Sequence, residues 1–188
     1  MKLRTVTVAR IAMLSALVVV LDYTMKFSGF KIPFPWLPFL KFDFTGIPIM
    51  LSVLTDGLNA GVFTSAIAFL AIMLRSGDVI GASMKAIAEF STGFGFYLGD
   101  KILKKSAASK VMSYMIGCIM RILIMSISTL PVFSLYYGMP LNAILAMSPL
   151  VAVFNFIHGL LSILGGNLVY EALRRRAPSI IFQREDQN

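Results

Sequence analysis

The sequence is poor in charged residues. Only 14% of its 188 residues are Asp, Glu, Lys or Arg, whereas 57% are hydrophobic and the mean hydropathy is +0.82. A soluble domain is nearer to about one quarter charged. So few charged side chains cannot cover the surface of a water-soluble globule of this size. The composition therefore favours a protein embedded in a lipid bilayer.

Cysteine and histidine each occur once, as Cys118 and His158. A single cysteine cannot form an intramolecular disulfide, and one Cys with one His supplies too few ligands for a zinc site. We interpret Cys118 as a small buried hydrophobic residue. The sequence also lacks a P-loop, an H-E-x-x-H helix and a G-x-S-x-G motif. We therefore expect no enzymatic activity, no cofactor and no metal.

The net charge of +8 does not indicate nucleic-acid binding. Lys and Arg lie mainly at the ends of apolar runs, where membrane topology requires them, and do not form a basic face interleaved with aromatic residues. We therefore exclude nucleic acid as a partner.

Long apolar runs predict an all-α integral membrane protein with six transmembrane helices. The runs lie near residues 6–27, 44–54, 60–74, 81–103, 111–136 and 150–173. Six spans of about 20 residues with short loops use nearly the whole length, so we expect one transmembrane substrate-binding domain over residues 1–188. The first run is too long for a signal-peptide core and has no small-residue cleavage site, which predicts a retained helix. We expect a loop at 137–148 and a polar tail from about 177 to 188.

Positive charge orients these helices. An even number of spans places both termini and the basic loop at 104–110 on one side, and the positive-inside rule predicts that this side is cytoplasmic. The first loop carries positive charge on the opposite side, against the rule, which indicates that this loop has a further role. The positive residues predicted on that outer side are Lys26, Lys31, Lys41 and Arg75.

The first loop, residues 28–43, is apolar and aromatic but is not predicted to be helical. Its three prolines, Pro33, Pro35 and Pro38, fall within six residues and forbid a regular helix. Irregular backbone near a membrane must be buried in protein or lie at a wet face. Trp36 in this loop could stack on a planar ligand, and an interfacial aromatic anchor is the alternative.

Ionisable residues within the apolar runs are candidates for a ligand site, because such groups face a cavity or each other. Lys85 and Glu89 are spaced i,i+4 and share one helix face, either to neutralise each other or to meet a ligand. Arg121 lies about ten residues inside its predicted helix and needs a partner, with Glu89 or Asp100 as the possibilities.

A polar stripe follows the last predicted helix. Ser148, Asn155 and Ser162 recur every seven residues, and His158 follows Asn155 by three. A hydrogen-bonded seam between helices would explain the stripe. Alternatively, Asn155 and His158 lie in the outer half of the helix, beside the Pro-rich loop, and suit a small, planar, polar ligand.

Small residues mark the first predicted helix. Ala9, Ala12 and Ala16 form a small-x-x-x-small pattern, which lets another helix approach closely. The approaching helix could belong to this chain or to a partner.

Several ordered motifs give the chain a resemblance to the substrate-binding S components of energy-coupling factor (ECF) vitamin transporters, most of all the riboflavin-binding type. Residues 12–16, AMLSA, are similar to the alanine motif that docks on the coupling subunit in that family. Residues 32–38, IPFPWLP, followed by 40–48, LKFDFTGIP, resemble its Pro-rich first loop and L-x-x-D-x-x-x-[IVL]-P pattern. Residues 154–158, FNFIH, are similar to its F-N-x-x-K motif.

Two further segments are similar to the riboflavin-type elements G-D-x-x-G and A-N-F-x-x-G. They are residues 77–81, GDVIG, and 88–93, AEFSTG. The chain departs from the family pattern at three positions. His158 stands in place of Lys, Glu89 in place of an amide, and Thr129 where the family often has Asn.

The resemblance implies six helices and a vitamin site near the outer face, capped by the first loop. It implies riboflavin as the transported ligand, a membrane coupling subunit and two ATPase subunits as partners, and a multi-pass location in a prokaryotic plasma membrane. The residues it implies for docking are Ala9, Ala12 and Ala16. Those it implies for ligand binding are Asn155, His158, Glu89, Lys85, Trp36, Leu40 and Thr129.

Other functions stay open at this point. The departures leave folate, pantothenate or a thiamine precursor as alternative ligands. A self-sufficient secondary transporter is a further alternative, although intramembrane charges are few. A membrane enzyme acting on lipids or prenyl groups would need clustered carboxylates, and Asp22, Asp43 and Asp56 are scattered along the sequence.

Overall fold

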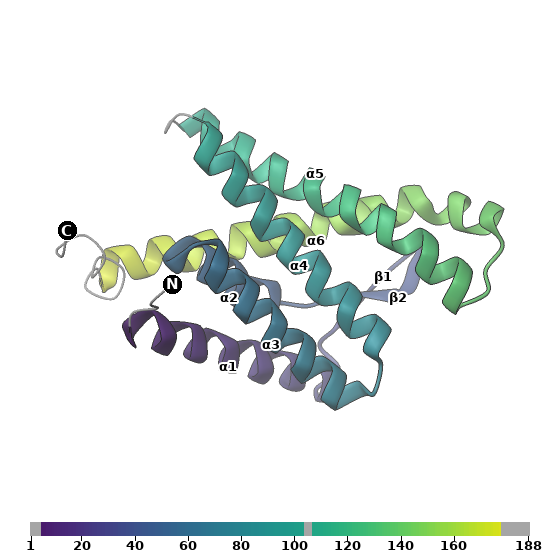
Figure 1. Cartoon of the computed structure of the whole chain (residues 1–188), viewed down its shortest axis with the longest axis horizontal. Helices are drawn as coiled ribbons and strands as arrows, with labels where there is room; N and C mark the ends of the chain where they lie inside the picture. The colour runs from purple at the N-terminus through teal and green to yellow at the C-terminus, as the bar shows by residue number, and fades with distance from the viewer. Residues whose placement is uncertain (1–4, 104–106, 178–188) are drawn as a thin grey trace.

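The computed structural model describes residues 5–103 and 107–177. This part of the chain forms six α-helices, one β-hairpin and one π-helical turn. In chain order they are α1 (Thr5–Phe27), β1 (Ile32–Phe34), β2 (Leu37–Phe42), α2 (Gly46–Asp56), α3 (Leu58–Ser76), α4 (Val79–Ile102), α5 (Ala107–Pro131), η1 (Val132–Tyr136) and α6 (Leu141–Arg176). The start of α1 and the end of α6 lie at the same end of the molecule, on the left of Figure 1, and the hairpin lies away from that end. The predicted six-helix fold is confirmed.

Four of the helices found in the described residues are long and apolar enough to cross a membrane. They are α1, α3, α5 continued by η1, and α6. Helix α4 has 24 residues but is not one of these four helices, and it carries Lys85 and Glu89. The side chain of Glu89 is buried inside the protein, so this charge does not face lipid.

Helix α2 is too short to span the bilayer alone. Its 11 residues extend about 16 Å, whereas the hydrocarbon core is about 30 Å thick. Asp56 at its end forms an ion pair of 2.9 Å with Arg10, in the first half of α1. Strand β2, which precedes α2 in the chain, lines a pocket. Non-helical backbone in a membrane protein is tolerated where protein covers it or a cavity adjoins it.

The prediction of a loop over residues 137–148 is wrong for most of that range. Helix α6 begins at Leu141 and continues without interruption through Pro149 to Arg176. Proline inside a helix is unfavourable because it lacks an amide donor. Ile144 and Val151, on either side of Pro149, are buried in the protein, and we attribute the continued helix to this packing. The polar tail predicted from about 177 lies, apart from Ala177, outside the described residues.

Proline has the opposite effect in α5. The regular helix ends at Pro131, and the next five residues form the π-helical turn η1. Val132 and Phe133 of this turn line the pocket described below. π-helical segments are frequent at functional sites, and this one aims two side chains that a continuous α-helix would place elsewhere.

Candidate ligand-binding site

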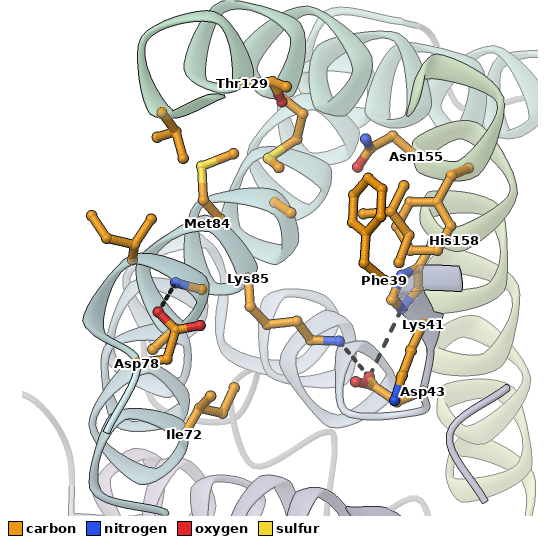
Figure 2. A pocket seen from close by; sticks show the side chains of 18 of the residues that line it. Phe39, Lys41, Asp43, Ile72, Asp78, Met84, Lys85, Thr129, Asn155 and His158 are labelled. Carbon is orange, nitrogen blue, oxygen red and sulfur yellow. Dashed lines mark hydrogen bonds and ion pairs between the residues drawn. The ribbon is translucent and has the colours of Figure 1, made fainter. Parts of the chain in front are cut away.

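A cavity of about 470 Å³ lies between the hairpin and helices α3 to α6 (Figure 2). Pockets for small molecules in proteins have volumes of this order. Its apolar walls combine aromatic rings with aliphatic and thioether side chains. They include Phe39, Leu40, Met84, Met125, Val151 and Phe154.

The hairpin forms one wall of this cavity. β1 and β2 are antiparallel, with Ile32 opposite Phe42 and Pro33 opposite Lys41. Phe34 and Leu37 are buried against Val151 and Phe154 of α6. The prediction that this segment is not helical is confirmed. Its prolines prevent a helix, and a two-stranded ribbon tolerates them because each strand has a free edge.

Arg121 is the centre of a buried polar cluster beneath the cavity. Its Nη1 lies 3.1 Å from Glu89 Oε1, and its Nε donates to Asn155 Oδ1 at 3.1 Å. Nη1 also donates to Thr92 Oγ1 at 3.1 Å, and Ser162 donates to Glu89 Oε2 at 2.9 Å. Of the two partners considered for Arg121, the structure selects Glu89. We call Glu89, Arg121, Asn155 and His158 the deep cluster.

The stripe on α6 serves both roles considered for it. Asn155 and Ser162 form hydrogen bonds to α5 and α4, as a seam between helices requires. Asn155 and His158 also line the cavity. Asn155 Nδ2 donates to the carbonyl of Val151 at 2.9 Å, so the amide retains a second N–H and a second lone pair.

His158 has unused hydrogen-bonding capacity. Its side chain is 1% exposed, and neither ring nitrogen has a hydrogen-bond partner among the residues that the structure describes. Nε2 lies 3.6 Å from Glu89 Oε1 and 3.9 Å from Asp43 Oδ1, which is too far for a hydrogen bond. A buried polar group without a partner is costly, and a ligand in the cavity would offer one.

Asp43 follows β2 and joins the hairpin to the helices. Its Oδ1 accepts from the hydroxyl of Thr45 at 2.6 Å and from Lys85 Nζ, as Figure 2 shows for the lysine. The Asp43 carboxylate is buried among positive side chains, of which Lys85 is the nearest. Lys85 lies 3.8 Å from Glu89, so the expected i,i+4 pair is present, with Asp43 as the nearer carboxylate.

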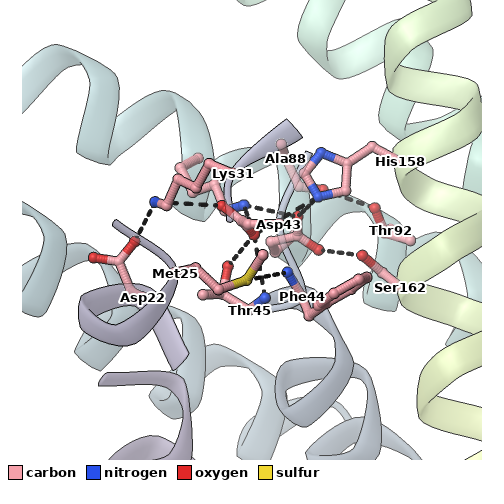
Figure 3. A network of polar contacts seen from close by, with 12 residues as sticks. Asp22, Met25, Lys31, Asp43, Phe44, Thr45, Ala88, Thr92, His158 and Ser162 are labelled. Atoms are coloured by element: carbon pink, nitrogen blue, oxygen red, sulfur yellow. Dashed lines mark hydrogen bonds and ion pairs between the residues drawn. The ribbon is translucent and has the colours of Figure 1, made fainter. Parts of the chain in front are cut away.

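A second buried carboxylate, Asp22 of α1, lies at the rim of the pocket. Asp22 Oδ1 is 2.5 Å from Lys31 Nζ, and Oδ2 is 2.5 Å from Nε of Arg75, at the end of α3. Lys31 Nζ also lies 3.6 Å from Asp43 Oδ2. Figure 3 shows Lys31 between the two carboxylates. We call Asp22, Lys31, Asp43 and Arg75 the rim cluster.

The two clusters form one series of alternating charges. It begins at the end of α3, passes through α1 and the hairpin, and ends on α5. Each neighbouring pair lies within 4 Å, and Lys85 joins the rim to the deep end. In order, the series is Arg75, Asp22, Lys31, Asp43, Lys85, Glu89 and Arg121.

Five of the predicted ligand-binding residues line the cavity. They are Asn155, His158, Lys85, Leu40 and Thr129. Glu89 lies behind the cavity wall, where it contacts Lys85 and Arg121. Trp36 does not line the cavity: its side chain is 64% exposed on the hairpin, with its ring edge against Phe34. This position suits the alternative of an interfacial anchor.

Five members of the two clusters were not predicted as ligand-binding, namely Asp22, Lys31, Asp43, Arg75 and Arg121. Two signals in the sequence pointed to some of them. Lys31 and Arg75 belong to the outer-side positive charges, and Arg121 is a charge deep in an apolar run. Apart from the family pattern, nothing in the sequence pointed to Asp43, because Lys85, to which it binds, lies 42 residues away in the chain.

The fold and the site define a class of protein. Membrane-spanning helices surround a partly polar cavity, and a hairpin forms one of its walls. Among the described residues, no three His, Cys, Asp or Glu side chains gather in a way that could hold a metal ion. The class is that of a multi-pass membrane protein with a pocket for a small organic molecule.

Comparison with known proteins identifies the family within this class. No family model matches the sequence. The chain is 28% identical to the riboflavin transporter FmnP of Bacillus subtilis (strain 168), with 76% of this chain and 81% of that protein covered. It is 30% identical to the riboflavin transporter RibU of Staphylococcus aureus (strain TCH60), with 87% of each chain covered. A solved structure of the S component of a bacterial ECF transporter matches with a TM-score of 0.75 at 29% identity, covering 90% of this chain and 95% of that one.

The chain therefore belongs to the S-component family of ECF transporters, together with these riboflavin transporters. It is a multi-pass cell-membrane protein. Its relatives are transport proteins, in agreement with the prediction that this chain is not an enzyme.

Proposed function

We propose that this protein is the substrate-binding subunit of an ECF-type vitamin importer and that it captures riboflavin from outside the cell. Two relatives are named riboflavin transporters, which supports the choice of ligand. The observation that carries the proposal is the floor of the cavity, where buried His158 and Asn155 retain unused hydrogen-bonding groups. In this proposal residues 1–188 form one substrate-binding domain with both termini in the cytoplasm.

The chemistry of riboflavin fits the two kinds of wall in the cavity. A flavin ring is planar and aromatic, and its edge carries imide and carbonyl groups. The ring faces would contact Phe39, Leu40 and Phe154, where aromatic contacts add to apolar burial. The polar edge would meet Asn155, which can donate and accept at once, and His158.

Residues of the deep cluster have different roles in this proposal. Asn155, His158 and Lys85 would contact the ligand, whereas Leu40 and Thr129 would shape the wall. Glu89 would act indirectly, because its carboxylate holds Arg121, and Arg121 holds the Asn155 amide.

We infer that α1 carries the docking surface for a membrane coupling subunit, which two ATPases would drive. Ala9, Ala12 and Ala16 are all exposed, which contradicts the alternative that they pack within this chain. Met13 and Leu17 beside them are also exposed, so this face of α1 is apolar and flat. Such a face permits close approach of another helix in the bilayer.

A riboflavin titration of the detergent-purified protein tests the ligand. We expect a flavin absorbance spectrum in the purified protein and stoichiometric quenching of added riboflavin fluorescence. Asn155→Ala should weaken binding about tenfold, since it removes hydrogen bonds to the ligand and to Arg121. Ser148→Ala, on the same stripe but outside the cavity lining, is the matched control and should bind normally. Absence of flavin and of quenching would exclude riboflavin and direct the search to folate, pantothenate or a thiamine precursor.

Tryptophan substitution on α1 tests docking. Ala12→Trp or Ala16→Trp should abolish copurification with the coupling subunit and vitamin uptake, because an indole ring prevents the helices from approaching. Riboflavin affinity of the isolated subunit should not change. Ala146→Trp, at an exposed position of α6, is the control for a bulky residue facing lipid. Intact complex formation and uptake in both α1 variants would refute the docking surface.

A further inference from the structure

Lys31 lies at the open end of the hairpin, where it bridges two buried carboxylates. It directly precedes β1, and Asp43 directly follows β2, so the strand register places the two residues opposite each other. Lys31 Nζ is 3.6 Å from Asp43 Oδ2 and 2.5 Å from Oδ1 of Asp22 on α1. One ammonium group therefore holds the two strand ends together and fixes both to the first transmembrane helix (Figure 3).

The rest of the hairpin is held by apolar contacts. Phe34 packs on Phe154 of α6 with ring centroids 5.6 Å apart, and Phe39 contacts Phe133 of η1 at 6.0 Å. These contacts lie on the side of α5 and α6. The side of α1 and α3 is held by Asp22, which accepts from Lys31 and from Arg75. Loss of the Lys31 contact would therefore free one side of the hairpin while the other stays packed.

We propose that Lys31 is a positioning residue for ligand capture: by clamping the hairpin to Asp22 and Asp43, it sets how long a bound ligand stays in the cavity. This proposal rests on the proposed function for the identity of the ligand. Phe39, Leu40 and Lys41 of the hairpin line the cavity, so movement of the hairpin would widen the way by which a bound ligand leaves.

The geometry of Asp22 supports this role over a purely structural one. Asp22 is fully buried, and Arg75 also neutralises it, with Nε at 2.5 Å. Asp43 likewise retains Lys85 when Lys31 is removed. Neither carboxylate would be left as an unpaired buried charge, so loss of Lys31 should release the hairpin without unfolding the helices. Removing one partner of a charge pair changes mainly the rate of dissociation, which here is that of the bound ligand.

The test compares Lys31→Met, which keeps the length of the side chain without its charge, with Lys31→Arg, which keeps the charge. Without ligand, hydrogen exchange of the amides of Phe34, Leu40 and Phe42 should be faster in Lys31→Met than in the wild type. With riboflavin, the dissociation rate measured by stopped-flow fluorescence should rise about tenfold. Lys31→Arg should restore both values. The thermal unfolding midpoint should change little.

Lys101→Met is the control, because Lys101 is exposed at the opposite end of α4. If hydrogen exchange of the hairpin amides is unchanged in Lys31→Met, the clamp is overturned, whether or not the dissociation rate of riboflavin changes. Faster exchange with an unchanged dissociation rate would overturn the role in ligand retention. If the wild type binds no riboflavin but hairpin exchange still depends on Lys31, the clamp is supported and riboflavin as the ligand is refuted.

Discussion

The rim cluster and the deep cluster belong to one series of charges but are built from different parts of the fold. The deep cluster is held by α4, α5 and α6, three long helices, and Glu89, Arg121, Asn155 and His158 are at most 2% exposed. The rim cluster is held by helix ends and a hairpin, and the Lys31 side chain is 15% exposed. Rigid helices suit recognition, which needs fixed geometry. A hairpin held by a partly exposed lysine suits a part that must open and close.

In the function that we propose, this difference would let one polar network serve both ligand binding and ligand release. In the deep cluster, Glu89 of α4 contacts Arg121 of α5 and Ser162 of α6, and Arg121 also donates to Asn155 of α6, so three helices hold these side chains together. In the rim cluster, Asp22 also pairs with Arg75, and Asp43 also pairs with Lys85. Loss of the Lys31 contacts therefore leaves neither buried carboxylate without a positive partner. The predictions below test this contrast.

The largest expected effect is loss of stability in Arg121→Ala. Glu89 would keep the Ser162 hydroxyl, with His158 at 3.6 Å and Lys85 at 3.8 Å, and breaking a buried ion pair costs about 3–5 kcal/mol. Lys31→Ala, its counterpart in the rim, should cost about 1 kcal/mol or less, as partly exposed pairs do. The unfolding midpoint can be followed with a thiol-reactive dye, because Cys118 is the only cysteine and is fully buried.

Lys110→Ala removes an exposed ion pair with Glu171 and calibrates the effect of a surface charge. Equal losses of stability in the Arg121 and Lys31 variants would contradict the contrast between the two clusters.

An intermediate effect is expected from Gly46→Ala, which tests how tightly the deep cluster is packed. A Cβ at Gly46 would lie 2.1 Å from Ser162 Oγ and 2.2 Å from Glu89 Oε2. The added methyl group should cost about 1–3 kcal/mol of stability and displace Glu89. We therefore expect a lower unfolding midpoint and weaker riboflavin binding in titrations.

Gly165→Ala is the matched control. Its Cβ would lie 2.6 Å from Cδ1 and 2.7 Å from Cγ1 of Ile47, an apolar side chain outside the deep cluster. A Gly46→Ala protein with normal riboflavin affinity would show that Glu89 does not position the ligand-binding residues.

The smallest expected effects come from two aromatic residues of the hairpin. Phe39→Ala should weaken riboflavin binding about fivefold, because Phe39 lines the cavity and loses part of its apolar contact. Trp36→Ala should leave affinity unchanged, because its ring lies on the exposed surface of the hairpin. Both are measured by the riboflavin titration. A larger loss in Trp36→Ala than in Phe39→Ala would show that the hairpin rearranges around the ligand.

Local patterns in the sequence predicted the parts of the site that lie on single helices. The i,i+4 spacing of Lys85 and Glu89 placed them on one face, and the stripe on α6 brought Asn155 and His158 to the cavity. The Gly77-Asp78 pair marked the boundary between two helices. Gly77 adopts φ +68° at the end of α3, and Asp78 caps α4 by accepting from the Gly81 amide at 2.8 Å.

Contacts between distant segments could not be predicted in the same way. Asp22 and Arg75 are 53 residues apart, and nothing in either segment specifies the other. Asp100 and Glu89 were equal candidates as partners of Arg121 until the packing of α4 against α5 was known. Trp36 and Phe39 lie in the same Pro-rich segment and are both largely exposed, and only the tertiary structure shows that Phe39 borders the cavity and Trp36 does not.

Composition alone determined that this protein lies in a membrane and is mostly helical. Long apolar runs with so few charges belong in lipid, and there a helix satisfies the hydrogen bonds of its own backbone. The tertiary structure decided that a β-hairpin precedes the short helix α2 and that α6 continues through Pro149. It also decided that seven charges from five segments form one series. The physical reason is that the hydrophobic effect and backbone hydrogen bonding act locally along the chain, whereas a buried charge is satisfied only by partners that folding brings within a few ångströms.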